Sequence, residues 1–100
     1  MVIRERFTDK VAIVTGAGGD IGREIARRFA REGAVAVIAD INLKAARETK
    51  KLIDEEGGRA QVVQVNLLKS EEIRNLVQAV IRENGRIDIL VNNAGIGERT

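Results

Sequence analysis

Several residue types are missing from this chain of 100 residues, and each absence removes a class of chemistry. Without cysteine there is no disulfide, no thiol nucleophile and no zinc–thiolate centre, which fits a cytoplasmic chain. Without histidine, imidazole catalysis and histidine metal sites are not expected either. Phe7 and Phe29 are the only aromatic residues, too few for a surface that stacks nucleic-acid bases.

Blocks of like charge and long apolar runs are missing as well. Charged residues make up 32% of the chain and nearly balance, at a formal net charge of +2, with the basic residues scattered. We therefore expect no nucleic-acid partner. The N-terminal residues lack the apolar core of a signal peptide, and no apolar run is long enough to cross a bilayer, so we expect no membrane partner.

A glycine-rich turn is the most informative stretch that is present. Residues 11–14 are apolar without a break, Thr15 ends that run, and an amphipathic segment begins at Ile21. This order predicts a buried parallel strand, a tight turn and a helix. Free amides and the positive end of the helix dipole suit a phosphate there, and glycine lets the backbone approach it. The candidate phosphate-binding residues are Gly16, Gly19, Asp20, Ile21 and Gly22.

The same strand–helix unit recurs along the chain. Asn42 and Ser70 are placed to cap the second and third helices, and glycines follow every predicted helix. In the first helix, Ile21 and Phe29 share the apolar face, while Arg23 and the other charged residues mostly face solvent. The predicted strands cover residues 10–16, 34–39, 59–66 and 87–91; the predicted helices cover 21–32, 43–55 and the segment from Ser70 to Asn84, with Ile73, Leu76, Val77, Val80 and Ile81 facing inward.

The element order β-α-β-α-β-α-β predicts an α/β fold, a Rossmann-like three-layer αβα arrangement around a parallel sheet. Gln61 and Gln64 interrupt the third apolar run, which places that strand at an edge. The predicted strand order is therefore 3-2-1-4. The glycine turn then lies at the switch point between strands 1 and 4, where open α/β sheets bind ligands.

The segment from Thr15 to Gly22, TGAGGDIG, resembles the T-G-x-x-x-G-x-G turn of the short-chain dehydrogenases/reductases. Asp20 stands where that pattern has its middle glycine. Two interpretations of Asp20 remain open. Its carboxylate points to solvent and favours the helix N-terminus, or it lies beside the pyrophosphate and alters cofactor binding.

Asp40 closes the second predicted strand, and Ile41 follows it. An acidic residue at this place can accept both hydroxyl groups of an adenosine ribose and would repel a 2′-phosphate. Since no basic residue follows, we expect the cofactor to be NAD rather than NADP. The alternative is a loop aspartate that caps the next helix.

Asn66 and Leu67 end the third predicted strand. The family often has aspartate at the position of Asn66, in contact with the adenine edge, and asparagine can both donate and accept hydrogen bonds there. The alternative is an ordinary turn residue.

Residues 92–95, NNAG, follow the fourth predicted strand and resemble the N-N-A-G segment of the family. The resemblance places Asn93, Ala94 and Gly95 near the nicotinamide ribose, where small residues allow close approach. Buried asparagine side chains can also tie neighbouring strand ends together.

The resemblance spans residues 10–97, the front part of the family fold. It implies hydride transfer between NAD(H) and a secondary alcohol or ketone, with the family's serine, tyrosine and lysine lying beyond this chain, which contains no tyrosine. We therefore expect residues 1–100 to be the N-terminal NAD-binding part of a single Rossmann domain that lacks its catalytic part and is inactive alone.

Two alternatives remain at this point. The chain could be a non-catalytic nucleotide-binding or sensor module that uses the same site. It could also be a fragment that binds no cofactor. In either case the predicted strand 87–91 has an exposed apolar edge, so we expect self-association.

Overall fold

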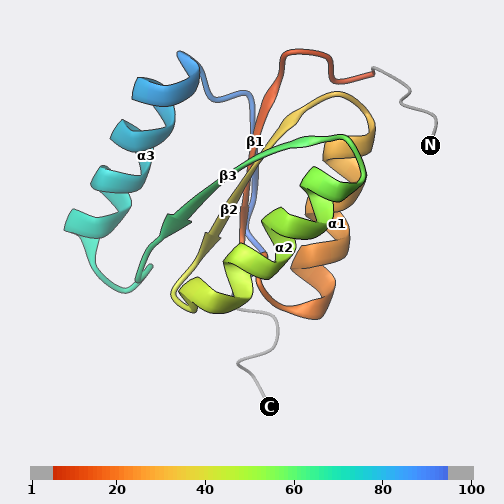
Figure 1. Ribbon diagram of the computed structural model, residues 1–100. Coiled ribbons are helices and arrows are strands. Elements are labelled where there is room, and N and C mark those ends of the chain that lie inside the picture. Colours follow the sequence, from red (N-terminus) through yellow and green to blue (C-terminus); the bar gives the residue numbers. More distant parts are fainter. Residues whose placement is uncertain (1–5, 95–100) are drawn as a thin grey trace.

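The computed structural model describes residues 6–94, which form a parallel sheet with helices on both faces (Figure 1). The strands pair in the order β3-β2-β1-β4, all parallel. This confirms the predicted Rossmann-like fold and strand order. The strands are β1 (Val11–Thr15), β2 (Val35–Asp40), β3 (Arg59–Gln64) and β4 (Ile89–Val91); the helices are α1 (Asp20–Arg31), α2 (Leu43–Glu55) and α3 (Ser70–Asn84).

Two apolar clusters lie on opposite faces of the sheet. Helices α1 and α2 cover one face and α3 covers the other (Figure 1). Because side chains alternate along a strand, β1 contributes to both clusters. Val14 belongs to the cluster under α1 and α2, and Ile13 belongs to the cluster under α3. Since all of β1 is buried, its unbroken apolar run is explained by cover on both faces.

The predicted helix ends are mostly confirmed. The side chain of Asn42 accepts a 3.0 Å hydrogen bond from the amide of Ala45 and so caps α2. Gly85 ends α3 in the left-handed conformation, with φ of 80°. Ser70 is not the cap of α3. Lys69 precedes the helix without a side-chain cap, and Ser70 is its first residue.

The edge strands are shorter than predicted. At the start of β4, the carboxylate of Asp88 accepts a hydrogen bond of 2.8 Å from the amide of Val11. The backbone amide of Asp88 also donates to the carbonyl of Val11 at 2.9 Å, and the paired register of β4 with β1 begins at Ile89. The third strand ends at Gln64, two residues before its predicted end, whereas β2 extends to Asp40.

Helix α3 is less buried than its sequence period predicts. Leu76 and Val80 are buried against the sheet. Ile73, Val77 and Ile81 were expected to face inward, but they are 40–44% exposed. A single helix covers this face in the described residues, so only one narrow stripe of α3 meets the sheet.

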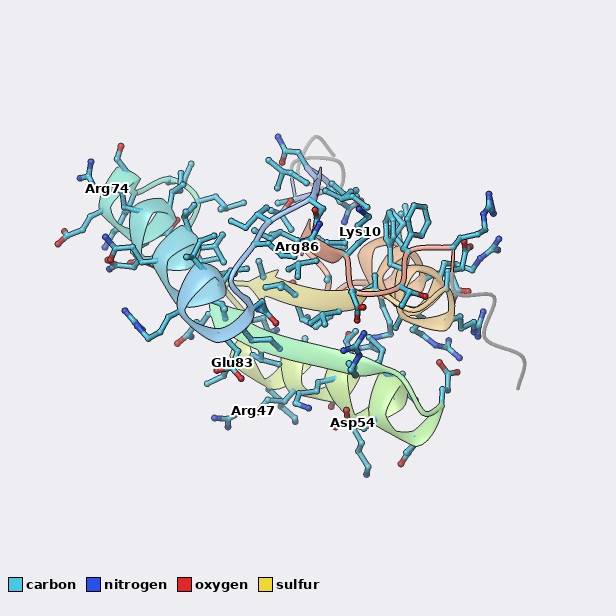
Figure 2. The ribbon with its side chains drawn as sticks, turned by 90° about the horizontal axis from the view of Figure 1, so that it is seen from above. Lys10, Arg47, Asp54, Arg74, Glu83 and Arg86 are labelled. Carbon is cyan, nitrogen blue, oxygen red and sulfur yellow. The ribbon has the colours of Figure 1, made fainter. Side chains whose placement is uncertain are left out.

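The charged side chains of the helices lie outside both clusters. Figure 2 shows Arg47 on α2 and Arg74 on α3 at the periphery of the molecule. Within residues 6–94, none of the helices combines the length and apolar character that a bilayer crossing needs.

Candidate functional site

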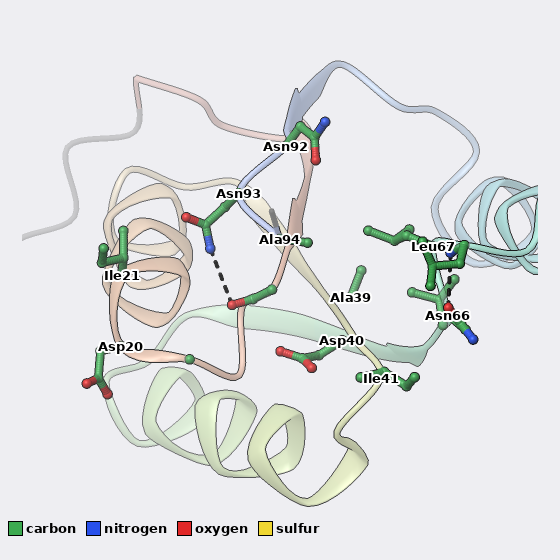
Figure 3. A pocket seen from close by; sticks show the side chains of 14 residues that line it. Asp20, Ile21, Ala39, Asp40, Ile41, Asn66, Leu67, Asn92, Asn93 and Ala94 are labelled. Atoms are coloured by element: carbon green, nitrogen blue, oxygen red, sulfur yellow. Dashed lines mark hydrogen bonds between the residues drawn. The ribbon is translucent and has the colours of Figure 1, made fainter. Parts of the chain in front are cut away.

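An open pocket of about 560 Å³ lies beyond the carboxyl ends of the strands (Figure 3). It occupies the switch point between β1 and β4, as the predicted topology requires. Of the predicted site residues, Gly22 lies beneath the pocket and Gly95 lies outside the described residues. The lining comprises Gly16, Gly19, Asp20, Ile21, Ala39, Asp40, Ile41, Val65, Asn66, Leu67, Leu68, Asn92, Asn93 and Ala94.

Sequence reasoning missed four of these lining residues. Ala39 and Val65 belong to apolar runs that predict only burial. Asn92 was assigned to the strand-end motif without a site role. Leu68 is 94% exposed and lies in the loop after β3. The signal that could have found them was their place at the ends of parallel strands, which converge on one edge of the sheet.

The glycine turn leaves room for a side chain only at Gly19. A Cβ atom at Gly22 would clash with the carbonyl oxygen of Gly16 and would lie 2.7 Å from Nδ2 of Asn93. At Gly16, where φ is +68°, a Cβ atom would lie 3.0 Å from Cα of Ala94. In contrast, a Cβ atom at Gly19 would meet only the Gly16 carbonyl oxygen, at 3.6 Å. Gly18 is also crowded, because a Cβ atom there would lie 2.8 Å from Oδ2 of Asp40. Gly16, Gly18 and Gly22 are therefore needed for packing, whereas Gly19 faces the open pocket.

Helix α1 presents unpaired amides at the pocket. Its first backbone hydrogen bond runs from the amide of Arg23 to the carbonyl of Gly19, at 2.7 Å. The amides of Asp20, Ile21 and Gly22 donate to no acceptor within residues 6–94. Free donors at the positive end of a helix dipole are suited to an anion.

The first two residues of α1, Asp20 and Ile21, both line the pocket, and only Ile21 differs from its predicted place. Asp20 is exposed, and its carboxylate points away from the middle of the pocket (Figure 3). This placement matches the first of the two interpretations of Asp20. Ile21 is not on the inner face of α1 as predicted; it is 58% exposed and lines the pocket. The apolar side chain of Ile21 therefore faces the pocket and not the sheet.

A network around Thr15 closes the site between β1 and β4. The buried hydroxyl of Thr15 accepts hydrogen bonds from the amides of Asn93, at 2.8 Å, and Ala94, at 3.0 Å. The side-chain amide of Asn93 donates to the carbonyl of Gly16 at 3.4 Å. The hydrogen bonds between neighbouring strand ends that the asparagines predict are therefore present. Thr15 also belongs to this network, although the sequence analysis did not single it out. Within the described chain, Oδ1 of Asn93 is buried without a partner.

Asp40 joins the end of β2 to the glycine turn. Its Oδ2 accepts a 2.8 Å hydrogen bond from the amide of Gly18, and its Oδ1 accepts one of 2.9 Å from Asn42. The alternative prediction, that Asp40 caps α2, is wrong, because the cap is Asn42. A carboxylate has about four acceptor positions, so each oxygen keeps capacity for another donor on the pocket side.

The far wall of the pocket is mostly apolar. Ile41, after β2, is 60% exposed, and Leu67 lies near it in Figure 3. Leu68 also lines the pocket. Asn66 uses its side-chain oxygen to accept from the amide of Leu68, at 3.0 Å, and its own amide donates to Glu72 at 2.7 Å. Asn66 therefore acts as a turn residue and also lines the pocket, with its side-chain NH₂ group still available as a donor.

A family model for short chain dehydrogenases matches residues 10–100. The chain belongs to the short-chain dehydrogenase family. Among its relatives, the 7α-hydroxysteroid dehydrogenase of Escherichia coli K12 is 44% identical over 92 residues, which are 92% of this chain and 36% of the relative.

Solved structures of the family superimpose on this chain. A 7α-hydroxysteroid dehydrogenase complexed with NADH and 7-oxo glycochenodeoxycholic acid gives a TM-score of 0.88 at 42% identity, covering 94% of this chain and 37% of the other. A metagenomic short-chain oxidoreductase in complex with NADP gives 0.86 at 36% identity, covering 90% and 41%. The chain thus spans about a third of the length of the relatives that it matches.

The pocket fits a nicotinamide dinucleotide in three respects. Free amides of α1 suit a pyrophosphate, the Asp40 carboxylate suits a diol, and the wall formed by Ile41 and Leu67 suits a flat base. Glycines at positions 16 and 22 keep the turn close to β4, which leaves the space outside Gly19 open. The donor set of this chain thus agrees with the cofactors named for its structural neighbours.

Proposed function

We propose that this chain is the NAD(H)-binding part of a short-chain dehydrogenase that transfers hydride between NAD(H) and a secondary alcohol or ketone. The observation that carries the proposal is the convergence of the Asp40 carboxylate and the free amides of Asp20 and Ile21 on one pocket. The related 7α-hydroxysteroid dehydrogenase in complex with NADH supports it. The cofactor supplies the hydride chemistry; the residues of this chain bind and orient it.

Each part of the cofactor has a proposed set of partners. The pyrophosphate is bound beside the turn by the free amides of Asp20, Ile21 and Gly22. The hydroxyl groups of the adenosine ribose donate to Asp40. The adenine ring lies between Ile41 and Leu67, with Asn66 at its edge. The nicotinamide ribose lies beside Asn93, Ala94 and Gly95, of which Gly95 is outside the described residues.

The preference for NAD over NADP follows from charge. A 2′-phosphate on the adenosine ribose would meet the carboxylate of Asp40, and like charges at contact distance repel. The pocket lining contains no lysine or arginine within the described residues to offset that repulsion. We therefore propose NAD as the cofactor, although a neighbour of similar fold is complexed with NADP.

Under this proposal, catalysis requires residues that lie outside this chain. The family's proton-transferring tyrosine has no counterpart here, because the sequence contains none. The 100 residues alone should bind cofactor without turning over alcohols. Turnover of a secondary alcohol by the purified chain with NAD would contradict this part.

A titration of NADH fluorescence tests the cofactor proposal. The chain has no tryptophan or tyrosine, so its own emission is low. We expect saturable binding of NADH and affinity for NADPH at least about tenfold weaker, the scale of one unfavourable charge contact. Equal affinity for both would refute the assignment of Asp40, and binding of neither would refute the proposed function.

We also propose that two copies of the chain associate through β4. This strand ends the sheet of the described residues, and its Leu90 is 65% exposed. Leu90 pairs with Ile13, so it lies on the α3 face of the sheet. Ile73, Val77 and Ile81 of α3, the helix that covers this face, are also exposed. An open strand edge beside apolar surface is a template for a second copy.

A further inference from the structure

Asp20 places an acidic side chain at the end of α1 that is suited to an anion. It is the first residue of that helix, it is exposed, and it lines the pocket. Its own backbone amide is one of those that donate to no acceptor within residues 6–94. A single residue therefore contributes both a donor for a phosphate and a negative charge that repels one.

The carboxylate of Asp20 is not neutralised by a neighbouring cation. It makes no hydrogen bond or ion pair with another residue of the described chain. Arg23, the first basic residue of α1, extends to α2 instead, where it donates to Oγ1 of Thr49 at 2.8 Å and lies 3.6 Å from Glu48. The charged groups of the described lining are the carboxylates of Asp20 and Asp40, so this lining holds no cation to offset either of them.

The orientation of Asp20 limits the repulsion without removing it. Its carboxylate points away from the middle of the pocket and leaves that space open (Figure 3). Charges act over the Debye length, which is about 10 Å at 0.1 M salt and about 30 Å at 0.01 M. At a distance on the order of 8 Å in water, one charge changes affinity by roughly a factor of two for each unit charge of the ligand. The carboxylate therefore discriminates between ligands by their charge and not by their shape.

Phosphate groups differ in the charge that they bring to this place. Each phosphate in the diester pyrophosphate of NAD carries about one negative charge at neutral pH. The terminal phosphate of ADP or ATP has a second ionisation near pH 6, so it carries about 1.5 to 2 negative charges at pH 7. Repulsion that grows with charge thus acts more strongly on nucleoside diphosphates and triphosphates than on a dinucleotide.

We propose that Asp20 is a charge filter, which raises the preference of the phosphate site for a diester pyrophosphate over nucleoside diphosphates and triphosphates. Specificity of this kind comes from repelling the competitor. The inference rests on the proposed function for the location of the pyrophosphate. NADH and NADPH share the same pyrophosphate, so the choice between those two belongs to Asp40 and not to the filter.

The same carboxylate stabilises the empty site. Gly19, which precedes α1, provides no side-chain cap. Negative charge in the first turn of a helix interacts favourably with the helix dipole, and Asp20 supplies that charge when no anion is bound. Replacing Asp20 should therefore lower the stability of the empty chain and raise its affinity for anions, two effects of opposite sign from one charge.

Glu71 provides a matched control on another helix. It is an exposed acidic residue in the first turn of α3, and it is absent from the pocket lining. Helix α3 covers the opposite face of the sheet from α1 (Figure 1). Glu71→Gln therefore removes a negative charge from the start of a helix without altering the phosphate site.

The ligand test compares adenosine, ADP-ribose and ATP on the full chain, by NMR titration without divalent cations at an ionic strength of about 0.01 M. ADP-ribose has the diester pyrophosphate of NAD, whereas ATP has a terminal phosphate. We expect Asp20→Asn to raise affinity about fourfold for ADP-ribose and about tenfold for ATP, and to change adenosine binding by less than about twofold. Glu71→Gln should leave every affinity unchanged. Equal gains for ADP-ribose and ATP, equal gains in both variants, or no gain would overturn the charge filter.

Salt and urea separate the filter from a change of shape and from the proposed function. In about 1 M salt, where the Debye length is about 3 Å, the gains of Asp20→Asn should disappear, and gains that persist would overturn the filter. Urea unfolding of the empty chain should show a lower midpoint for both variants, and an unchanged midpoint for Asp20→Asn would overturn its role in the empty site. A gain for ATP in a chain that does not bind NADH would uphold the filter and count against the proposed function.

Discussion

Asp40 serves the fold and the proposed site with the same carboxylate. It accepts the amide of Gly18 and so holds the glycine turn beside β2, and its remaining acceptor capacity faces the pocket. A Cβ atom at Gly18 would lie 2.8 Å from its Oδ2, so a larger residue there would displace the carboxylate. The glycine and the aspartate are therefore one unit.

Replacing Asp40 by asparagine separates these two roles. The amide keeps a carbonyl oxygen for the turn but loses the negative charge and an acceptor for the ribose. In the NADH and NADPH titrations, we expect Asp40→Asn to lower the ratio of NADH to NADPH affinity about tenfold.

Asp20→Asn is the matched control for that variant. Asp20 also lines the pocket, but its carboxylate is exposed and points away from the middle. We expect it to change both affinities alike and to leave their ratio unaltered. A ratio that moves with Asp20 and not with Asp40 would show that the wrong aspartate had been assigned to the ribose.

Single residues were predictable from the sequence where their position and residue type alone indicate their chemistry. Asp40 and the glycines follow from position and residue type. Thr15 and Arg23 were not predictable, because their partners lie 78 and 26 residues away and no local period marks them. Arg23 in particular was assigned to a solvated face, since a helical wheel cannot show that a neighbouring helix supplies acceptors.

At the scale of elements, α1 and α2 are joined by a second set of contacts at their other end. Arg27 donates to Glu56 through Nε, at 3.2 Å, and through Nη2. Arg31 also lies 3.5 Å from the same carboxylate. The hydrogen bond from Arg27 is the main cause that holds the pKa of Glu56 below its ordinary value of 4.5.

This lowered pKa predicts how stability depends on pH. The ionised form of Glu56 is favoured in the folded state, so its contribution is present above the unfolded pKa and is lost as pH falls through the folded pKa. At pH 7, Glu56→Gln should lower the free energy of unfolding by about 0.5–1 kcal/mol, typical of a partly exposed ion pair.

Urea unfolding at several pH values measures this difference. It should shrink as the pH falls below the ordinary pKa of Glu56, 4.5, and disappear below the lowered pKa of the folded state, where the wild-type carboxylate is protonated in both states. A difference that stays constant from pH 7 to pH 3 would contradict the ionic origin of the effect.

Elements were predicted with their order and type correct, and their ends only in part. Gly85 and Asn42 act through backbone rules that are local, so their roles are visible in sequence. At the start of β4, the amide of Val11 donates to the side chain of Asp88, a contact 77 residues apart that no local pattern marks. The exposure of Ile73 on α3 depends on which other elements cover that face of the helix. The periodicity of the sequence carries no information on those elements.

At the scale of the whole molecule, the open edge of β4 predicts association. Sedimentation velocity over a range of concentrations should show a mass that rises toward that of a dimer. Leu90→Lys should keep the chain monomeric, because a charge on an edge strand opposes pairing. Leu68→Lys, at a more exposed leucine beside the pocket, should not. A monomer mass independent of concentration in the wild type would contradict the proposal.

The measurement that tests the proposed function most directly is a map of NAD binding on the amide spectrum of the chain. We expect the shifted signals to come from the turn between Gly16 and Gly22 and from Asp40, Ile41, Asn93 and Ala94, with α3 beyond Ile73 unaffected. Shifts confined to other surfaces, or no shifts at saturating NAD, would contradict the assignment of this pocket to the cofactor.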